Sequence, residues 1–469
     1  MIFSSIPFLF FFFVYFLILY FLVPKKFKNL VLLIFSLIFY AWGEPVYIVL
    51  MIFSSAFNYM MGLSLEKKAK DKKLCKKLLV ISILVNLLLL GFFKYVDFLI
   101  DIVNNLLNLD ISYLNLGLPI GISFFTFQTM SYTIDVYRKD VKASHNFLDF
   151  TTYVSMFPQL IAGPIVRYET VNEELQNREH SFSKFSSGLL RFMRGLFKKV
   201  LLANNIGLLF TLISNLGNNE LSVLLAWLGA ISYMLQIYFD FSGYSDMAIG
   251  MGKMLGFNYL ENFNYPYIAT SITDFWRRWH ISLSSWFKDY LYIPLGGNRV
   301  SKIINIRNIL IVWMLTGLWH GANYNFIIWG LYYGIILILE KYFLKNILDK
   351  LPKALRHIYT LVIVLISWVI FAFDDITILT YYMKTLFGLT KAPFINSNFL
   401  YYFSNYFIIL LLGAIFSTPI YPSLMEKLKN TKRKNLVFFI TLFIYIILFV
   451  ITVSYLVSDT YNPFLYFRF

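Results

Sequence analysis

The stretch "ILIVWMLTGLWHGANYNFIIWGLYYGIILIL", residues 309–339, shows most directly which fold the sequence predicts. Two apolar runs are separated by the short segment "HGANYN", whose glycine and asparagines are typical of a turn. Each run predicts an apolar helix, so the stretch predicts a pair of helices with His320 at its apex. A histidine in such a place either faces a functional cavity or hydrogen-bonds across helices and holds them together.

The composition extends this prediction to the whole chain. Of the 469 residues, 59% are hydrophobic and 14% are charged, and the mean hydropathy is +0.66. Soluble domains are typically about 45–50% apolar and about 25% charged. We therefore predict an all-α polytopic membrane protein with about ten to twelve transmembrane helices and additional re-entrant and interfacial helices. Hydrophobic segments lie near residues 6–23, 29–43, 45–62, 78–100, 113–130, 147–166, 187–213, 220–240, 308–319, 323–340, 356–373, 398–418 and 435–457.

Nothing in the sequence divides the chain into separate parts. We find no fixed-period repeat, Gly/Ser-rich linker or disordered tail, so we expect one membrane-embedded domain over residues 1–469. The first hydrophobic segment lacks a basic leading region and a cleavage site with small residues, and it is expected to remain as a helix.

Lysine-rich loops predict the orientation in the cell membrane. These loops are "PKKFK" at 24–28, "EKKAKDKKLCKK" at 66–77 and "EKLKNTKRK" at 426–434. Because basic residues collect in cytoplasmic loops, we expect a multi-pass protein of the cytoplasmic membrane with its N-terminus outside. The same loops account for much of the net charge of +16. No basic helix or aromatic platform for bases accompanies that charge, so we expect no nucleic-acid partner.

The loop charges also locate His320. The preceding helix leaves the cytoplasmic side near Arg307, and a rise of about 1.5 Å per residue carries the chain roughly 20 Å to His320. This position lies past the middle of a hydrocarbon core about 30 Å thick. An imidazole with an ordinary pKa of about 6.5 suits a general base. We expect Gly317 and Gly321 to let backbone or substrate approach the ring closely.

Residues 257–307 interrupt the apolar pattern with charged and polar residues mixed with aromatics. Such a segment is tolerated at membrane depth only where protein or water satisfies it, so we predict an interfacial or re-entrant segment that lines a cavity. His280, in "RRWHISLSSW", is either functional or a histidine at a wet cationic interface. Trp276, Arg277 and Arg278 are typical of an interface-anchored helix. The basic residues that place the segment on the cytoplasmic side are Arg277, Arg278, Lys288, Arg299, Lys302 and Arg307.

Two further stretches have open interpretations. "YFDFSGYSDMAIG", residues 238–250, places Asp240 and Asp246 at the end of an apolar run, where they either cap a helix or line a polar cavity. "FPQLIAGPIVRY", residues 157–168, predicts a helix that is broken around Gly163, as a kink or as part of a binding site. The single cysteine and the five histidines show no spacing of metal ligands, so we predict no metal site.

Five stretches, taken together, carry a family signature. They are "GISFFTFQTMSYTIDVYR" (121–138), "FPQLIAGPIVRY" (157–168), "DFSGYSDMAIG" (240–250), "NFNYPYIATSITDFWRRWHISLSSWFKDYLYIPLGGNR" (262–299) and "LWHGANYNFIIWG" (318–330). In this order they resemble the membrane-bound O-acyltransferase family, in particular its bacterial branch of alginate and peptidoglycan O-acetyltransferases. The resemblance covers roughly half of the chain, with a motif core at about 121–330.

The resemblance implies acyl transfer to a hydroxyl group by a ring of helices around a central tunnel. His320 matches the histidine that the family uses as its catalytic residue, and His280 matches a second family histidine whose role is less settled. His320 would act as a general base on the acceptor or would carry the acyl group. The candidates for lining a substrate or donor channel are Asp240, Asp246, Trp276, Arg277, Arg278, Trp319 and Asn323.

The resemblance also implies partners. We expect no bound cofactor, a cytoplasmic thioester as donor (acetyl-CoA or an acyl carrier), and a polysaccharide acceptor served by a separate extracytoplasmic esterase-like acetyltransferase. Two alternatives remain at this stage. One is D-alanyl transfer from a carrier protein to teichoic acid, although "LYIPLGGNR" is more similar to the alginate-type branch. The other is a non-enzymatic polysaccharide or lipid exporter, although no pair of inverted repeats with broken helices is visible.

Overall fold

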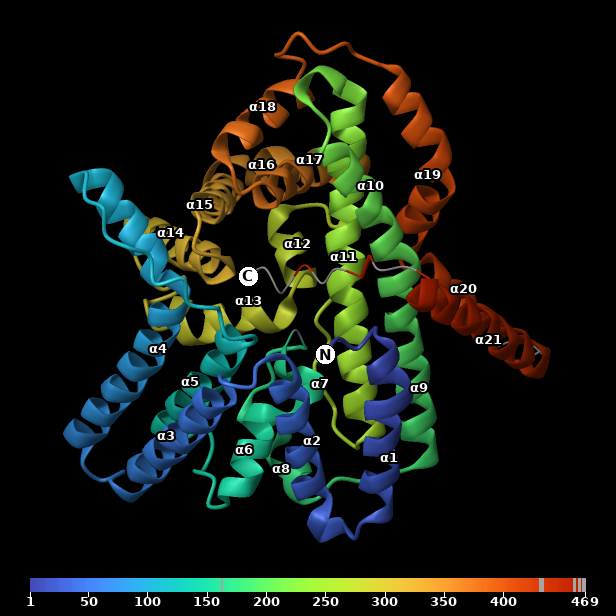
Figure 1. Cartoon of the computed structure of the whole chain (residues 1–469). Helices are drawn as coiled ribbons and strands as arrows, with labels where there is room; N and C mark the ends of the chain where they lie inside the picture. The colour runs from blue at the N-terminus through green and yellow to red at the C-terminus, as the bar shows by residue number, and fades with distance from the viewer. Residues whose placement is uncertain (162, 430–433, 459–460, 463–464, 466–469) are drawn as a thin grey trace. The chain divides into compact units, whose positions relative to one another are not determined.

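The computed structural model describes residues 1–161, 163–429, 434–458, 461–462 and 465, and all regular structure among these residues is helical (Figure 1). Within this described part, ten helices are long and apolar enough to cross a membrane, which confirms the predicted fold class. The candidate spans are Lys25–Gly43, Ile48–Lys67, Lys72–Leu107, Phe182–Ser214, Val223–Met254, Lys302–His320, Tyr324–Leu348, Lys353–Ala372, Ser397–Phe416 and Asn435–Ser458.

The chain forms two compact units. One comprises Met1–Phe192 and Ser245–Glu261, and the other comprises Met193–Tyr244 and Asn262–Phe469. The organisation as a single domain stays a prediction. The α-helices of the first unit are α1 (Phe13–Leu22), α2 (Lys28–Gly43), α3 (Ile48–Lys67), α4 (Lys72–Leu107), α5 (Ile122–Arg138), α6 (Phe147–Ser155), α7 (Phe157–Leu160), α8 (Tyr168–Gln176), the first part of α9 (Phe182–Phe197) and the part of α11 (Val223–Met254) from Ser245 onward.

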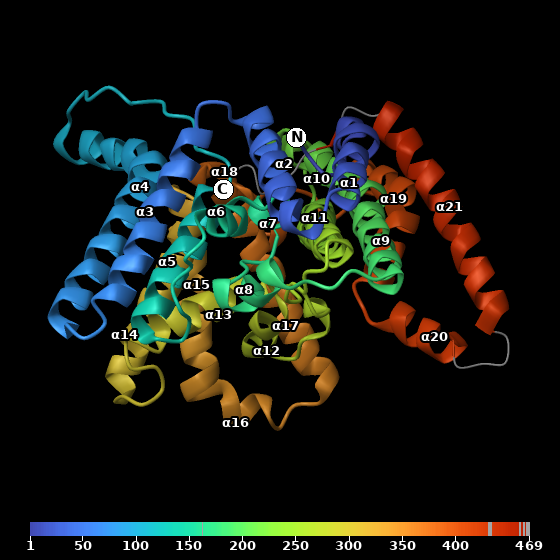
Figure 2. The ribbon, with the colours of Figure 1, turned by 90° about the horizontal axis from the view of Figure 1, so that it is seen from below.

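Polar side chains connect α3, α4 and α5, which lie side by side in the first unit (Figure 2). The amides of Asn58 on α3 and Asn86 on α4 donate to each other, at 2.8 and 3.1 Å. Thr129 on α5 donates to Asn86 (3.2 Å), and Ser82 on α4 donates to Thr133 on α5 (3.1 Å). Hydrogen bonds of this kind between membrane helices contribute about 0.6–2 kcal/mol each.

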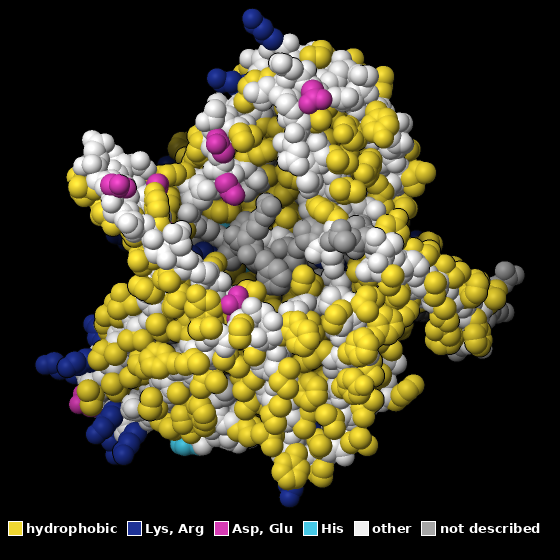
Figure 3. Space-filling view, in the orientation of Figure 1, with side chains coloured by type: hydrophobic (Ala, Val, Ile, Leu, Met, Phe, Trp, Pro, Cys, Tyr) yellow, Lys and Arg dark blue, Asp and Glu magenta, His cyan; other side chains and the backbone are white. Residues whose placement is uncertain are grey.

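The surface of the first unit agrees with a membrane environment. Figure 3 shows hydrophobic side chains over most of this face, with Lys and Arg gathered at the turn between α3 and α4. That turn belongs to the lysine-rich loop that was predicted to be cytoplasmic.

The first unit also contains the predicted broken helix. α6 ends at Ser155, the short α7 contains Pro158, and no regular helix follows until α8 begins at Tyr168. The side-chain amide of Gln159 donates to the Tyr153 carbonyl at 2.7 Å, so it satisfies a backbone group at the break. By contrast, the predicted apolar segment 113–130 is helical only from Ile122. The residues before Ile122 form a loop. In this loop the backbone N–H groups of Leu114 and Asn115 donate hydrogen bonds to the carboxylate of Asp97.

The second unit contains the predicted helix pair of residues 309–339. α11 passes through the predicted apolar run 220–240 and continues to Met254, so neither Asp240 nor Asp246 caps it. The elements of this unit are the last part of α9, α10 (Asn205–Ser214), α11 (Val223–Met254, up to residue 244), α12 (Ile272–Arg278), α13 (Ile281–Phe287), a π-helix (Lys288–Tyr292), α14 (Lys302–His320), α15 (Tyr324–Leu339), a π-helix (Glu340–Leu344), α16 (Lys345–Leu348), α17 (Lys353–Ala372), α18 (Ile376–Leu386), α19 (Ser397–Phe416), α20 (Ile420–Lys429) and α21 (Lys434–Ser458).

α14 and α15 form the predicted helix pair, with His320 as the last residue of α14. Their backbones touch at two glycines. A Cβ atom at Gly317 would overlap with the carbonyl oxygen of Phe326, and one at Gly330 would overlap with that of Trp313. Gly321 likewise leaves room for the ring of Phe326. Both glycines make room for α15, and at Gly317 it is backbone that approaches closely, in agreement with one of the two predicted purposes. Close approach of a substrate to the imidazole stays a prediction.

We expect Gly317→Ala to separate α14 from α15 and to destabilise the protein by about 1–3 kcal/mol, as other overpacking substitutions do. The measurement is thermal unfolding of purified protein in detergent. Gly91→Ala on α4 is the matched control, because a Cβ there meets no described atom within 4 Å beyond its own helix. Equal melting temperatures for the two variants would contradict the role of Gly317.

Candidate active site

His320 lies in an aromatic enclosure within the second unit. Its side chain is almost fully buried. Three rings meet the imidazole nearly edge to face: Trp319 at 5.1 Å between centroids, Trp329 of α15 at 5.0 Å and Phe371 of α17 at 5.3 Å. The end of α14, the start of α15 and the end of α17 therefore meet at this ring. An apolar enclosure of this kind strengthens any electrostatic interaction that the imidazole makes with a substrate.

His280 is the second buried histidine of this unit, and it begins α13. Its backbone has φ +44°, a conformation that residues other than glycine seldom adopt, and its side chain is fully buried. The ring packs edge to face against Phe241 at 4.6 Å and lies 6.1 Å from the ring of Trp319. The structure thus brings both predicted histidines next to the ring of Trp319.

Asn262 determines which nitrogen of His280 carries the proton. The Oδ1 atom of Asn262 accepts the backbone N–H of Ser282 (3.2 Å) and the Ser282 hydroxyl (2.9 Å). Because an N–H can only donate, the atom that faces it must be the amide oxygen. His280 Nδ1, 3.1 Å from the same oxygen, must therefore donate its hydrogen to it. In the neutral ring the lone pair is then on Nε2.

The neutral form of His280 is also favoured electrostatically. Burial, together with the neighbouring His320, holds the pKa of His280 well below its usual range. A neutral ring with a lone pair on Nε2 can accept a proton from a substrate.

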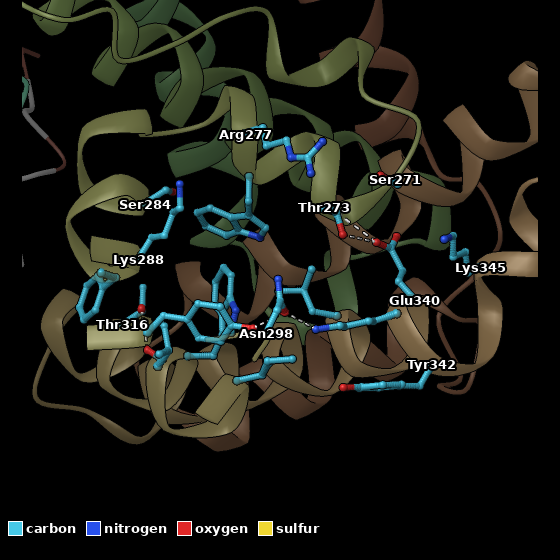
Figure 4. A pocket seen from close by; sticks show the side chains of 18 of the residues that line it. Ser271, Thr273, Arg277, Ser284, Lys288, Asn298, Thr316, Glu340, Tyr342 and Lys345 are labelled. Atoms are coloured by element: carbon cyan, nitrogen blue, oxygen red, sulfur yellow. Dashed lines mark hydrogen bonds between the residues drawn. The ribbon is translucent and has the colours of Figure 1, made fainter. Parts of the chain in front are cut away.

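A pocket of about 800 Å³ opens beside this centre, lined by α12, α13, α14 and the segment from α15 to α17. Five of its lining side chains are cationic and two are carboxylates. Figure 4 shows Arg277, Lys288 and Lys345 on three sides of the pocket. In the part of the chain that the structure describes, neither Arg277 nor Lys288 forms a salt bridge. The cationic lining residues are Arg277, Lys288, Lys341, Lys345 and Arg356.

One stripe of α14 leads from the pocket towards His320. Ile309, Val312 and Thr316 line the pocket at helical spacing. His320 follows Thr316 by four residues, which is about 6 Å along the axis on nearly the same face. Thr316, a lining residue of the pocket, therefore lies about one helical turn from His320 along α14.

Glu340 holds α12, the helix that forms another wall of the pocket. Its buried carboxylate accepts the backbone N–H of Ile272 (2.7 Å) and both the N–H and the hydroxyl of Thr273 (3.0 Å each). These N–H groups belong to the first turn of α12, where a negative charge is favourable. Ser271 completes the cap by accepting the N–H of Asp274 at 3.0 Å. Glu340 thereby positions α12, which carries Trp276 and Arg277.

The other predicted residues of α12 have distinct surroundings. Trp276 is buried among aromatic rings and is not an anchor at an interface, because Trp313, Trp329 and Tyr333 surround it. Arg277 is exposed in the pocket, as a contact with an anionic donor would require. Arg278, unlike Trp276 and Arg277, does not line the pocket. Its guanidinium group pairs with the carboxylate of Asp274 at 2.9 Å.

The two predicted aspartates both form buried ion pairs. Asp240 pairs with Lys199 at 2.5 Å, and both side chains are almost completely buried. Asp246 belongs to the first unit, where it pairs with Arg191, which also bonds Glu261. Asn323 is half-buried and precedes the first residue of α15, in the turn after His320.

Sequence reasoning did not single out Asn262 or Glu340. Asn262 is the first residue of the quoted stretch 262–299, and its short polar side chain next to aromatics was a usable signal. Glu340 follows an apolar run, and nothing in the local sequence links it to a helix that begins about 70 positions earlier. Among the described residues, no group of three or more His, Cys, Asp or Glu side chains could hold a metal ion.

Helices of membrane-spanning length, two buried histidines and an adjoining cationic pocket define a multi-pass membrane protein with a candidate catalytic centre in its second unit. The chain belongs to the membrane-bound O-acyltransferase family, whose sequence model matches residues 8–383, and it is therefore an acyltransferase.

Individual relatives agree with the family assignment. The chain is 44% identical over 382 residues to the probable alginate O-acetylase AlgI of Pseudomonas aeruginosa, covering 81% of this chain and 73% of the relative. It is 36% identical over 428 residues to the peptidoglycan O-acetyltransferase of Helicobacter pylori, covering 83% and 80%. It is 31% identical over 243 residues to the teichoic acid D-alanyltransferase of Bacillus subtilis, covering 48% and 60%.

We expect Asn262→Ala to lower acyl transfer by up to about 100-fold, because the His280 ring loses the acceptor that orients it. Asn262→Asp keeps an acceptor but adds a negative charge, which raises the pKa of His280. Below this raised pKa the ring is protonated, and Nε2 no longer has a free lone pair. As the pH is lowered, the rate of acyl transfer should therefore begin to fall at a higher pH in Asn262→Asp than in the wild type. The measurement is the pH profile of acyl transfer.

Asn264→Asp is the control for this experiment, because it adds the same charge at an exposed position two residues away. If the acidic side of the pH profile shifts equally in Asn262→Asp and Asn264→Asp, the effect does not act specifically through His280.

Proposed function

We propose that the protein transfers acetyl groups from acetyl-CoA in the cytoplasm to hydroxyl groups of a cell-envelope or secreted polysaccharide. The relatives named for alginate and peptidoglycan acetylation cover 81% and 83% of the chain, whereas the D-alanyltransferase of Bacillus subtilis covers 48% at lower identity. The single observation that carries the proposal is the position of His320, one helical turn beyond a pocket with a cationic lining. Such a pocket suits a donor with an anionic carrier portion.

In the proposed reaction, His320 removes the proton of the acceptor hydroxyl, and the oxygen attacks the carbonyl carbon of the thioester. The tetrahedral intermediate collapses by cleavage of the C–S bond, and the proton passes from His320 to the departing thiolate. The products are an O-acetyl ester and a free thiol. His280, with the lone pair on Nε2, would serve as a second acceptor of protons near the same centre.

His320 could instead carry the acyl group. In that course the imidazole attacks the thioester first, releases the thiol and then passes the acyl group to the hydroxyl. Quenched reactions with radiolabelled acetyl-CoA distinguish the two courses, because only a carrier leaves label on the protein, and this label is absent in His320→Ala.

The proposed setting is the cytoplasmic membrane, with the N-terminus outside and the pocket open to the cytoplasm. The lysine-rich loops support this orientation. The acceptor lies on the other side of the membrane and would receive the acetyl group with the help of a separate extracytoplasmic esterase-like acetyltransferase. Membership in a family of acyltransferases weighs against the exporter alternative.

We expect His320→Ala to lower O-acetylation of the polymer by about 100-fold or more, because general-base catalysis contributes about 10²–10⁴-fold. The experiment complements a deletion strain and measures acetyl and D-alanyl groups on the envelope polymers by mass spectrometry. His145→Ala is the control, since His145 is exposed and pairs with Glu66 in the first unit.

Undiminished acetylation by His320→Ala, in membranes that contain wild-type amounts of protein, would refute the catalytic role. Loss of D-alanyl groups in place of acetyl groups in the deletion strain would refute the proposed donor.

We expect Arg277→Gln and Lys288→Gln each to raise the KM for acetyl-CoA by roughly 3- to 10-fold, with kcat little changed, because exposed cations attract the donor without acting on the reacting atoms. High salt should weaken the difference from wild type. Arg299→Gln is the matched control, an exposed arginine outside the pocket lining. A KM that rises equally in all three variants would contradict a specific role for the pocket.

A further inference from the structure

One indole links the pocket lining to the rings around His320. Trp276 lines the pocket and is only 7% exposed. It lies nearly edge to face with Trp329, at 5.6 Å between ring centroids. Trp329 is fully buried, lies outside the pocket lining and contacts the His320 ring at 5.0 Å. The side chain of Trp276 therefore has the pocket on one side and the aromatic enclosure of His320 on the other.

The position of this indole is fixed by its neighbours. Trp313 packs against it at 4.6 Å and Tyr333 at 4.9 Å, from α14 and α15 respectively. The backbone of α12 is held by the Glu340 cap described above. A large planar side chain that is enclosed in this way has few other rotamers available. Its displacement by a substrate would disturb three helices at once.

We propose that Trp276 limits the transferred group to the size of an acetyl, and so determines the acyl specificity of the enzyme; this inference rests on the proposed function. The pocket, at about 800 Å³, is much larger than an acetyl group and has room for the carrier portion of a donor. Trp276 is the lining residue that contacts Trp329, and Trp329 in turn contacts the imidazole of His320 at 5.0 Å. In the proposed reaction the acyl group approaches His320 beside these two rings.

We expect the site to discriminate between acyl groups by their size. Trp276 and Trp313 line the pocket, and Trp329 and Tyr333 pack behind Trp276, so a longer acyl chain beside Trp276 would meet a wall of closely packed rings. A close-fitting apolar site rejects one additional methylene by about 10- to 200-fold. Propionyl and butyryl thioesters should therefore enter the pocket but react poorly.

The test is a competition between donors. Membranes that contain the full chain and its native polymer are incubated with equal concentrations of acetyl-, propionyl- and butyryl-CoA, each with a different isotope label. Mass spectrometry then gives the ratio of acyl groups on the polymer. We expect Trp276→Ala to raise the propionyl-to-acetyl ratio at least 10-fold. Trp276→Phe, which keeps an aromatic ring in the cluster, should raise it by a smaller factor.

The ratio separates a size filter from a structural role, because partial unfolding lowers all products together. Trp286→Ala is the matched control: it removes a buried indole of α13 that lies outside the pocket lining. An unchanged ratio in both Trp276 variants, with acetyl transfer still measurable, would overturn the inference. If wild-type membranes transfer no acetyl from acetyl-CoA to the polymer, the proposed function itself fails.

Discussion

The backbone contact between α14 and α15 at Gly317 and Gly330 is the constraint on which the site depends. With no side chains at the crossing, α15 lies close enough for Trp329 to reach the imidazole that ends α14. α17 contributes Phe371 from the third side. The enclosure of His320 is thus a consequence of how closely two helices approach, and a methyl group at the crossing would open it.

The buried polar and charged groups of the second unit need partners inside the protein. Removing polar atoms from water is costly unless each finds a partner. For His280 the Asn262 amide oxygen is that partner, and the same bond selects the tautomer. Charged groups follow the same rule. Lys199 and Asp240 are both buried and paired, and loss of either partner would leave an uncompensated charge at a cost of about 3–5 kcal/mol.

The pocket combines cationic and aromatic side chains. Its cationic residues would attract the proposed anionic donor by long-range electrostatics. Trp276 and Trp313 also line it, and Trp276 contacts Trp329, which packs against His320. Glu340 connects the two kinds of side chain, because one carboxylate holds the helix that presents both Arg277 and Trp276. Under the two proposals, a substitution at Glu340 should affect donor binding and acyl specificity together.

The sequence by itself determined the class of fold, since apolar runs of membrane-spanning length have only the helix as a stable form in lipid. It also identified the α14–α15 pair and pointed to His320 and His280, because an ionisable residue in an apolar or motif-rich stretch is conspicuous. It could not reveal that Asn262 orients His280, that Glu340 caps α12, or that Trp276 is enclosed by rings of α14 and α15. These are contacts between residues from about 18 to 70 positions apart, and hydropathy and local spacing carry no information about them. Only the tertiary structure decided them, because they depend on which helices pack together and how closely their backbones approach.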